Sequence, residues 1–376
     1  MHLALDARFW GLEHTGLGRY TMQLITHLLQ QDTDTNYSLI IHPSKTEEIK
    51  QLITHRIGTQ LYTSPARAYT AAEQWQVAKL VHQINPQLLH VPHFNIPVFS
   101  STPLITTIHD LITLESKGVA ATTLPQWQYQ FKWQVHKQTI KHAVNKSRAI
   151  ITPSIYTKGK LLEYFQLDSQ KIHITYEAPD KLYFKKSSNP SLKLPPAPYF
   201  VYTGNAYPHK NFERLAQALK YLQTDLAQRA HLAIVCGRGV FQQRIQQLTD
   251  KYQLQAQIIF YQTISNQQLR LLYQNAIGFI TPSLLEGFGL PALEAMAAQT
   301  LVLSSDASCL PEIYQQHAIY FDPYSIDSIA TTMQRALIMP QETRQELITD
   351  AYRHAQTFSW QKMAEQTHQI YQQILQ

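Results

Sequence analysis

The stretch that decides the fold spans residues 278–298 and reads GFITPSLLEGFGLPALEAMAA. Its first four residues form a short apolar run, as expected of a strand that is buried on both faces of a parallel sheet. A glycine-containing loop follows, and Pro291 then stands where the first turn of a helix would begin, a position that suits proline. The segment therefore predicts a strand, a loop and a helix start.

The same alternation of apolar runs and amphipathic helical patterns continues on both sides of this segment. The strand-like runs are 39–42, 88–91, 104–108, 149–152, 199–202, 232–236, 258–261, 278–281 and 301–304, and the helical patterns are 20–31, 215–224, 242–252 and 267–274. Such repeated alternation predicts α/β doubly wound architecture. A chain of 376 residues has room for two domains of roughly 150–200 residues each.

One segment interrupts the alternation. Residues 184–198 read FKKSSNPSLKLPPAP, a composition that is typical of a linker and excludes a helix. We therefore predict a first domain at 1–183 and a second at 199–358, with their sheets facing a central cleft where such folds bind ligands. The helical segment 359–376 is expected to pack back on the first domain, although it could simply end the second.

The bulk composition limits the classes of partner and location. The net charge of +6 indicates an anionic partner, which could be a phosphate-bearing ligand, nucleic acid or an acidic membrane surface. The sequence shows no export signal and no apolar window of about 18 residues. Cys236 and Cys309 are expected to be buried and reduced, so a cytoplasmic location is expected.

The loop and helix start around residue 289 carry the strongest chemical signal. A helix start presents free N–H groups and a positive dipole end, and Gly287 and Gly289 allow a ligand to approach the backbone closely. An anionic group is therefore expected at residues 290–292. Glu294, expected in the first helical turn, could accept hydrogen bonds from a ribose diol, with Glu286 across the loop. Either glutamate alone could merely complement the helix dipole.

This segment closely resembles the E-x7-E motif of retaining GT-B glycosyltransferases, in particular glycosyltransferase family 4 (group 1), and the resemblance covers essentially the whole chain. It implies two Rossmann-like domains and transfer of a hexose from a nucleoside diphosphate sugar to a glycan or lipid-linked acceptor hydroxyl. By the resemblance, Glu286 lies by the donor sugar and Glu294 binds the ribose. The donor loop also includes Gly287, and backbone amides of Phe288, Gly289 and Leu290 would meet sugar hydroxyls and phosphate.

A second stretch, YTGNAYPHKN, looks like the G-x-x-x-P-R-K-N stretch of this family. The lysine there pairs with the donor diphosphate, which implies the same role for Lys210, and an ammonium suits a leaving group that gains charge. His209 stands where arginine is common, and Asn205 follows Gly204 where several members carry a second phosphate-binding arginine. The diphosphate is therefore held by fewer cations, or Arg238 contributes.

Two further candidates lie in the first domain. The sequence TGLGRY, with Gly16 and Gly18, follows a strand and opens a helix, and it looks like the family loop that closes on the donor phosphates. The dinucleotide fingerprint is incomplete, which disfavours NAD. His109 ends a strand-like run, and resembling enzymes place a histidine here against the donor sugar. The alternative is a structural histidine at the end of the strand.

A basic stretch separates these candidates from the second domain. Residues 116–160 contain no acidic residue. The basic residues are Lys117, Lys132, Lys137, Lys141, Lys146, Arg148, Lys158 and Lys160, and the interleaved aromatic residues are Trp127, Tyr129, Phe131 and Trp133. This pattern favours a peripheral element at the inner face of an anionic membrane, while core aromatics with a solvated lysine face are the alternative. No nucleic-acid motif accompanies it, so a nucleic-acid partner is not expected.

We therefore predict a retaining hexosyltransferase in which His109, Glu286 and Lys210 are the catalytic residues. No Asp-x-Asp motif lies in a suitable place, and Lys210 with the helix N-termini is expected to replace a metal ion. The Gly-Leu-Gly-Arg-Tyr opening resembles mannosyl- and rhamnosyltransferases, which favours GDP-mannose as donor. The alternatives are a hydrolase that uses the two glutamates, a sugar-nucleotide 2-epimerase on the same fold, and a non-catalytic sugar-nucleotide-binding protein.

Overall fold

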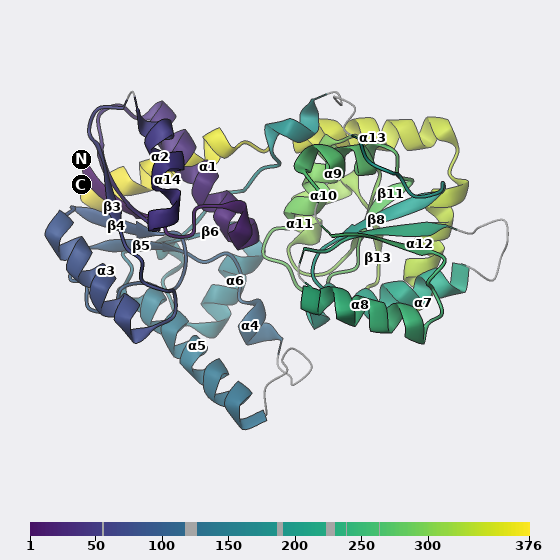
Figure 1. Cartoon of the computed structure of the whole chain (residues 1–376), viewed down its shortest axis with the longest axis horizontal. Coiled ribbons are helices and arrows are strands. Elements are labelled where there is room, and N and C mark those ends of the chain that lie inside the picture. The colour runs from purple at the N-terminus through teal and green to yellow at the C-terminus, as the bar shows by residue number, and fades with distance from the viewer. Residues whose placement is uncertain (55, 117–125, 186–190, 223–229, 238, 263) are drawn as a thin grey trace. The chain divides into compact units, whose positions relative to one another are not determined.

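The structure, a computed structural model, describes residues 1–54, 56–116, 126–185, 191–222, 230–237, 239–262 and 264–376. The chain divides into two compact units (Figure 1). Unit 1 comprises the described residues up to Glu177 together with Ser359–Gln376, and unit 2 comprises the described residues from Ala178 to Phe358. Both units are α/β and doubly wound, as the sequence predicted.

Unit 1 is built on a seven-stranded, all-parallel sheet with the order β3-β2-β1-β4-β5-β6-β7. Its strands are β1 (His2–Asp6), β2 (Asn36–Ile41), β3 (Thr59–Thr63), β4 (Leu88–Val91), β5 (Leu104–Thr107), β6 (Ala149–Thr152) and β7 (Ile172–Ile174). The strand order reverses between β1 and β4, so the loops that follow these two strands diverge and leave space at the carboxyl edge.

Helices cover both faces of this sheet. The longer ones are α1 (Thr15–Gln31), α2 (Thr46–Ile53), α3 (Ala71–Ile84), α5 (Gln126–Lys146), α6 (Ile155–Tyr164) and α14 (Trp360–Leu375), with the short α4 (Ile112–Glu115) before α5. Figure 1 shows α1, α2 and α14 on one face and α3, α5 and α6 on the other. The C-terminal helix α14 packs against α1, and Tyr371 Oη lies 2.5 Å from His90 Nδ1 on β4. The last helix therefore belongs to unit 1.

Unit 2 repeats the plan with a six-stranded parallel sheet in the order β10-β9-β8-β11-β12-β13. Its strands are β8 (Tyr199–Thr203), β9 (His231–Val235), β10 (Ile258–Tyr261), β11 (Gly278–Thr281), β12 (Val302–Ser305) and β13 (Ile319–Phe321). Its helices are α7 (Phe212–Leu222), α8 (Gly239–Lys251), α9 (Asn266–Gln274), α10 (Leu290–Ala297), α11 (Leu310–Tyr314), α12 (Ile326–Ile338) and α13 (Gln341–Ala355), with short 3-10 turns η5 (Lys181–Phe184) and η6 (Pro208–Lys210).

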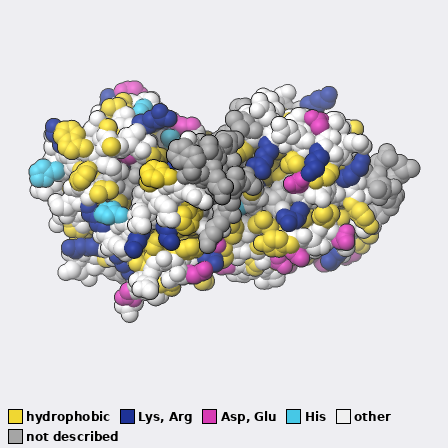
Figure 2. Space-filling model, turned by 90° about the horizontal axis from the view of Figure 1, so that it is seen from below, with side chains coloured by type: hydrophobic (Ala, Val, Ile, Leu, Met, Phe, Trp, Pro, Cys, Tyr) yellow, Lys and Arg dark blue, Asp and Glu magenta, His cyan; other side chains and the backbone are white. Residues whose placement is uncertain are grey.

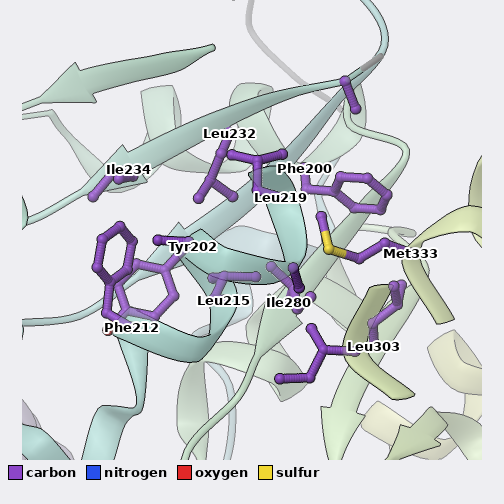
Figure 3. Packing of buried hydrophobic residues seen from close by; sticks show 14 of the residues in the cluster. Phe200, Tyr202, Phe212, Leu215, Leu219, Leu232, Ile234, Ile280, Leu303 and Met333 are labelled. Carbon is purple, nitrogen blue, oxygen red and sulfur yellow. The ribbon is translucent and has the colours of Figure 1, made fainter. Parts of the chain in front are cut away.

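The core of unit 2 lies between its sheet and the helices α7, α8 and α12. The side chains drawn in Figure 3 meet there from both layers: Phe200, Tyr202, Phe212, Leu215, Leu219, Leu232, Ile234, Ile280, Leu303 and Met333. Each of these side chains is at least 97% buried, and full burial of a large apolar side chain stabilises the fold by about 1.5–3 kcal/mol. The packed core fixes β8 and β11 side by side, and with them the loops at their carboxyl ends.

The boundary between the units lies slightly earlier than the sequence suggested. The expected end of the first domain at residue 183 falls inside η5, which packs on α9 and α10 of unit 2. The described part of the proposed linker also belongs to unit 2, because Tyr261 Oη donates to Lys193 O (2.6 Å) and Gln268 Nε2 donates to Ser191 O (3.0 Å). These side-chain hydrogen bonds attach the segment to β10 and α9, and no sequence pattern predicts them.

Both cysteines are free and buried, in agreement with the expectation. Within the described ranges, no helix combines the length and the apolar character needed to cross a bilayer.

Candidate functional site

The carboxyl edge of the unit 2 sheet, where the strand order reverses between β8 and β11, carries the two strongest candidates. Lys210 ends η6 in the loop after β8, and Glu286 lies in the loop after β11. Doubly wound sheets bind ligands at such a reversal. The fold therefore brings together two residues that are 76 positions apart in sequence.

The loop after β8 is held in place by an asparagine that follows Lys210. Asn211 adopts a left-handed conformation (φ 56°), which asparagine tolerates better than most residues. Its Nδ2 donates to Pro282 O (3.0 Å) after β11 and to Pro323 O (2.7 Å) after β13. Asn211 thus ties the backbone beside Lys210 to two neighbouring loops. Sequence analysis quoted this residue within a motif but assigned it no role.

Lys210 and Glu286 form an ion pair. Lys210 Nζ lies 2.6 Å from Glu286 Oε1, with 22% and 14% of the two side chains exposed. Burial alone would raise the pKa of Glu286, but the charge and hydrogen bond of Lys210, with a hydrogen bond from Ser283, lower it below its ordinary value. Glu286 is therefore ionised at neutral pH, and the pair presents both a donor and an acceptor group at the sheet edge.

The neighbouring histidine contributes no charge. Burial, followed by the charge of Lys210, lowers the pKa of His209 to about 4, so its ring is neutral at pH 7. The ring stacks on Tyr207, with centroids 5.4 Å apart and an interplanar angle of 14°. Asn205 Oδ1 accepts a weak hydrogen bond from Cys236 Sγ (3.5 Å). Along residues 203–210, all of them described, Lys210 is thus the sole cation at pH 7, and Arg238 lies outside the described residues.

The loop between β11 and α10 is anchored by residues that sequence analysis did not single out. Ser308 Oγ accepts a hydrogen bond from Glu286 N (3.1 Å), and Cys309 Sγ donates to Glu286 O (3.2 Å). At the other end of the loop, Tyr314 Oη donates to Gly289 O (2.6 Å). The start and end of the loop are therefore both held by the segment that runs through α11.

Gly289 occupies a position that only glycine fits. Its φ is +93°, in the region that L side chains rarely adopt. A Cβ atom added there would lie 2.1 Å from Tyr314 Oη and 2.8 Å from Leu310 Cδ2. Gly204, in the loop after β8, also has a positive φ of 146°. Gly289 and Gly204, both predicted to bind the donor, thus allow their loops to adopt a backbone conformation with positive φ.

The helix start predicted at this loop is present. α10 begins at Leu290 with Pro291 in its first turn. Glu294 lies in the second turn and not in the first, because the helix begins one residue before the proline. Its exposed fraction is 3%, and Phe288 and Leu290 are also buried, at 5% and 8%. Gly287 is buried as well. The roles of these residues in donor binding stay predictions.

In unit 1, His109 follows β5 and lies among side chains and backbone from three other segments. Its Nδ1 lies 3.2 Å from Glu177 Oε1, and its Nε2 lies 3.1 Å from Pro92 O. The ring of Tyr20 on α1 meets it edge-on, with centroids 4.6 Å apart. Glu177 lies 68 positions from His109 along the chain, so no local sequence pattern predicts this contact.

The carboxyl ends of β1 and β4 are joined by a buried ion network. Arg8 pairs with Asp6 (2.7 Å) and Glu73 (2.6 Å), and Asn95 Nδ2 donates to Glu73 Oε2 (2.8 Å). Burial would lower the pKa of Arg8, but the two carboxylates raise it, so the guanidinium stays charged. Arg8 is only 8% exposed and its guanidinium is paired with both carboxylates, so the network links the loops after β1 and β4.

The two N-terminal glycines lie in the first turn of a helix, which agrees with the expectation that this segment opens a helix but not with the expectation of a loop there. α1 begins at Thr15, so Gly16 and Gly18 are its second and fourth residues. A Cβ at Gly18 would lie 1.8 Å from Gly11 O, whereas a Cβ at Gly16 would meet nothing within 4 Å. Gly18 therefore allows α1 to pack on the preceding backbone. Gly16 is exposed and leaves the helix start open.

The predicted basic stretch contains the long helix α5, whose apolar surface is partly exposed, and continues through β6 into α6. Phe131 and Val135 on α5 are 69% and 50% exposed, and Lys146 Nζ donates to Val98 O (2.5 Å). Trp133 instead packs inward and donates to Thr113 O (3.0 Å). In Figure 2 the Lys and Arg side chains are interspersed with hydrophobic ones over the visible face. Lys117 and the side chains of Trp127 and Tyr129 lie outside the described residues.

Among the described residues, no group of three or more His, Cys, Asp or Glu side chains is arranged to hold a metal ion.

Comparisons with known proteins give a consistent result. Residues 184–354 match the model of the glycosyl transferases group 1, and residues 14–181 match that of Glycosyltransferase Family 4. The chain is 25% identical to the O-antigen chain mannosyltransferase RfbU of Salmonella typhimurium, over 83% of this chain and 84% of that protein. It is 24% identical to the O-antigen chain mannosyltransferase B of Escherichia coli, over 95% and 96%. The structure of Anabaena HepE in complex with UDP-glucose has the same fold, with a TM-score of 0.74, 13% identity and coverage of 99% and 100%.

Proposed function

This chain belongs to the group 1 glycosyltransferases of the family 4 type, with the GT-B fold, and from that premise we propose that it transfers mannose from GDP-mannose. The proposed acceptor is a hydroxyl group of a glycan or of a lipid-linked glycan, and the anomeric configuration is retained. The observation that carries the proposal is the Lys210–Glu286 ion pair at the strand-order reversal of unit 2. The choice of mannose is supported by two relatives whose names describe O-antigen mannosyltransferases.

The ion pair suits a donor that carries a diphosphate next to a sugar. A diphosphate brings more negative charge than one carboxylate, so it competes with Glu286 for the ammonium of Lys210. As the glycosidic bond breaks, the leaving diphosphate gains charge, and Lys210 stabilises that charge. Glu286, ionised at neutral pH, then accepts hydrogen bonds from sugar hydroxyls.

The charges in the loop after β8 indicate which groups bind the diphosphate. His209 is neutral at pH 7 and Asn205 is uncharged, so Lys210 carries the charge of the loop after β8. The start of α10, with Gly289 in front of it, adds backbone N–H groups and the positive end of the helix dipole. We propose that these groups hold the diphosphate without a divalent metal ion.

The direct test is product formation with defined donors. Purified protein is first screened by thermal shift against GDP-mannose, UDP-glucose, UDP-galactose and dTDP-rhamnose. The stabilising donor is then incubated with and without a mannose-terminated oligosaccharide. Elongation of the oligosaccharide by one hexose supports the proposal. Conversion of the donor to its 2-epimer without acceptor supports the epimerase alternative, and stabilisation without any product supports a binding protein.

The surface of unit 1 supports a location at an anionic membrane. Residues 74–108 and 116–162 contain no acidic residue, and they supply α3 from Gln74 onward, the loop after β4, and α5. Trp75 and Phe99 are 60% and 71% exposed, and Lys79 Nζ lies 5.2 Å from the ring centroid of Trp75. Exposed aromatic side chains among lysines favour the headgroup region of an anionic bilayer. We propose that this face binds the cytoplasmic leaflet reversibly.

Vesicle co-sedimentation tests the membrane proposal. The protein should sediment with vesicles that contain anionic lipid and stay in solution with neutral vesicles, and the double variant Trp75→Ser/Phe99→Ser should bind more weakly. The matched control is Tyr324→Ser, since Tyr324 is also an exposed aromatic residue (65%) but lies in unit 2. Equal binding to neutral and anionic vesicles would contradict the proposal.

A further inference from the structure

Both ring nitrogens of His109 face groups that accept hydrogen bonds. Nε2 lies 3.1 Å from the carbonyl oxygen of Pro92, and Nδ1 lies 3.2 Å from Glu177 Oε1. A carbonyl oxygen can only accept, so Nε2 carries a hydrogen. An ionised carboxylate also only accepts, so Nδ1 carries a second hydrogen. The two contacts are satisfied together by the imidazolium form of the ring.

The surroundings of the ring agree with a positive charge. Burial would lower the pKa of His109, but the hydrogen bond and charge of Glu177, the carbonyl of Pro92 and the charge of Asp110 raise it above its ordinary value. Asp110 is the neighbour on the same segment. From the elements packed around it, the ring also faces Tyr20 on α1, Glu177 after β7, and the histidines 90 and 93 at β4.

The two neighbouring histidines do not compete for the proton. Burial lowers the pKa of His90 and of His93 to about 3 each, with a further contribution from the charge of His109. Both are therefore neutral at physiological pH. Tyr20 is buried, and its hydroxyl group forms a hydrogen bond with Thr107 Oγ1 (3.2 Å). Its contact with the His109 ring is a T-shaped ring contact.

Glu177 is well placed to hold the charge on His109. It follows β7, where Thr175 N donates to Thr152 O (3.0 Å) and extends the pairing of β6 with β7. Its side chain is 7% exposed, against 19% for His109. A carboxylate that is largely removed from water and 3.2 Å from an imidazole acts more strongly on its pKa than an exposed one.

We propose that Glu177 is a positioning residue that keeps His109 doubly protonated, so that His109 serves glycosyl transfer as a fixed positive charge and not as a proton donor or acceptor. This inference rests on the proposed function for its kinetic part and on the geometry alone for its spectroscopic part. The ring is fully engaged by Glu177 and Pro92, so it has no nitrogen left to move a proton to or from a substrate.

The kinetic test compares Glu177→Gln with the wild type between pH 6 and 9. The amide still accepts a hydrogen bond but no longer supplies charge, so the pKa of His109 returns toward the ordinary 6.5. At pH 8 a histidine of that pKa is about 3% protonated, so kcat of the variant should be roughly 30-fold below its value at low pH. Because Glu177 raises the pKa of His109, the wild-type rate should begin to fall only at a higher pH than the rate of the variant. Glu163→Gln is the matched control, because Glu163 is an exposed glutamate (61%) of the same unit.

The spectroscopic test uses protein labelled with ¹⁵N-histidine, with the signals of residue 109 identified by their loss in His109→Gln. At pH 7.5 the wild type should show both ring nitrogens protonated, and Glu177→Gln should show one. A neutral His109 ring in the wild type would overturn the inference. The inference would also be overturned if Glu177→Gln lowered kcat by the same factor at every pH while the His109 ring of the variant stayed doubly protonated. If the wild type transfers no sugar from any donor, the proposed function fails, and the NMR result still decides the protonation of His109.

Discussion

Gly289→Ala tests the geometry of the donor loop most sharply, because the structure specifies both the backbone strain and the clash. At φ +93° an L residue costs roughly 1–2 kcal/mol relative to glycine. The new methyl group would lie 2.1 Å from Tyr314 Oη, so the tyrosine must move and its hydrogen bond to Gly289 O is lost, at a cost of about 0.5–1.5 kcal/mol. The expected destabilisation is therefore roughly 1.5–3.5 kcal/mol.

A double-mutant cycle separates the two contributions. Tyr314→Phe removes the hydroxyl group that the methyl group would strike, so Gly289→Ala should cost less in the Tyr314→Phe background than in the wild type. We expect the double variant to be more stable than the sum of the single variants by about 1 kcal/mol. Chemical denaturation measures the free energy of unfolding of all four proteins. A wild-type value for Gly289→Ala, or strict additivity in the cycle, would refute the placement of Tyr314 over Gly289.

Four further outcomes are expected at other positions and conditions. Lys210→Ala should lower kcat by about 100-fold or more, measured as product formed per minute. The same change should destabilise the protein above pH 4.5, where Glu286 is ionised and loses its partner, and the difference should shrink as acid protonates the carboxylate, as pH-dependent denaturation can show. Gly18→Ala should destabilise strongly, because its Cβ would strike Gly11 O, whereas Gly16→Ala should be neutral or stabilising by up to about 1 kcal/mol. EDTA should leave the transfer rate unchanged, and a rate that requires added Mg²⁺ or Mn²⁺ would contradict the metal-free proposal.

Much of the fold is readable from the sequence because the signals are local. The central strands, such as β9 and β11, contain continuous apolar runs, as expected of strands that are buried on both faces. The edge strands β3, β7 and β13 were not predicted, because β3 and β7 contain polar residues and β13 has only three residues. An edge strand pairs with only one neighbour and is less buried, so its sequence need not be apolar throughout.

The start of α1 was misplaced for a different reason. Glycine has a low intrinsic preference for helix, so Gly16 and Gly18 predicted a loop. The tight approach of Gly18 to the backbone at Gly11 overrides that preference, because no larger residue fits there. Tertiary packing therefore sets the start of α1 at Thr15, several residues before the position expected from the local sequence.

In the candidate site, too, residues within local motifs were predicted and contacts between distant segments were not. Lys210, Glu286 and His109 were found because each lies in a short recognisable motif. Glu177, which lies beside His109, and Tyr314, which donates to Gly289 O, have no local motif, since both contacts join separate segments of the chain. Sequence motifs therefore point to the candidate groups, while the neighbours that set their charge and hold their loops follow from the fold.

The measurement that tests the central claim most directly is transfer of labelled mannose from GDP-mannose to a mannose-terminated oligosaccharide, with the new linkage examined by NMR. We expect an acceptor-dependent product with the donor's anomeric configuration, formed by the wild type and almost abolished in both Lys210→Ala and Glu286→Ala. Rates in these two variants equal to that of the wild type, or a wild type that forms no glycosidic bond with any nucleotide sugar, would contradict the account.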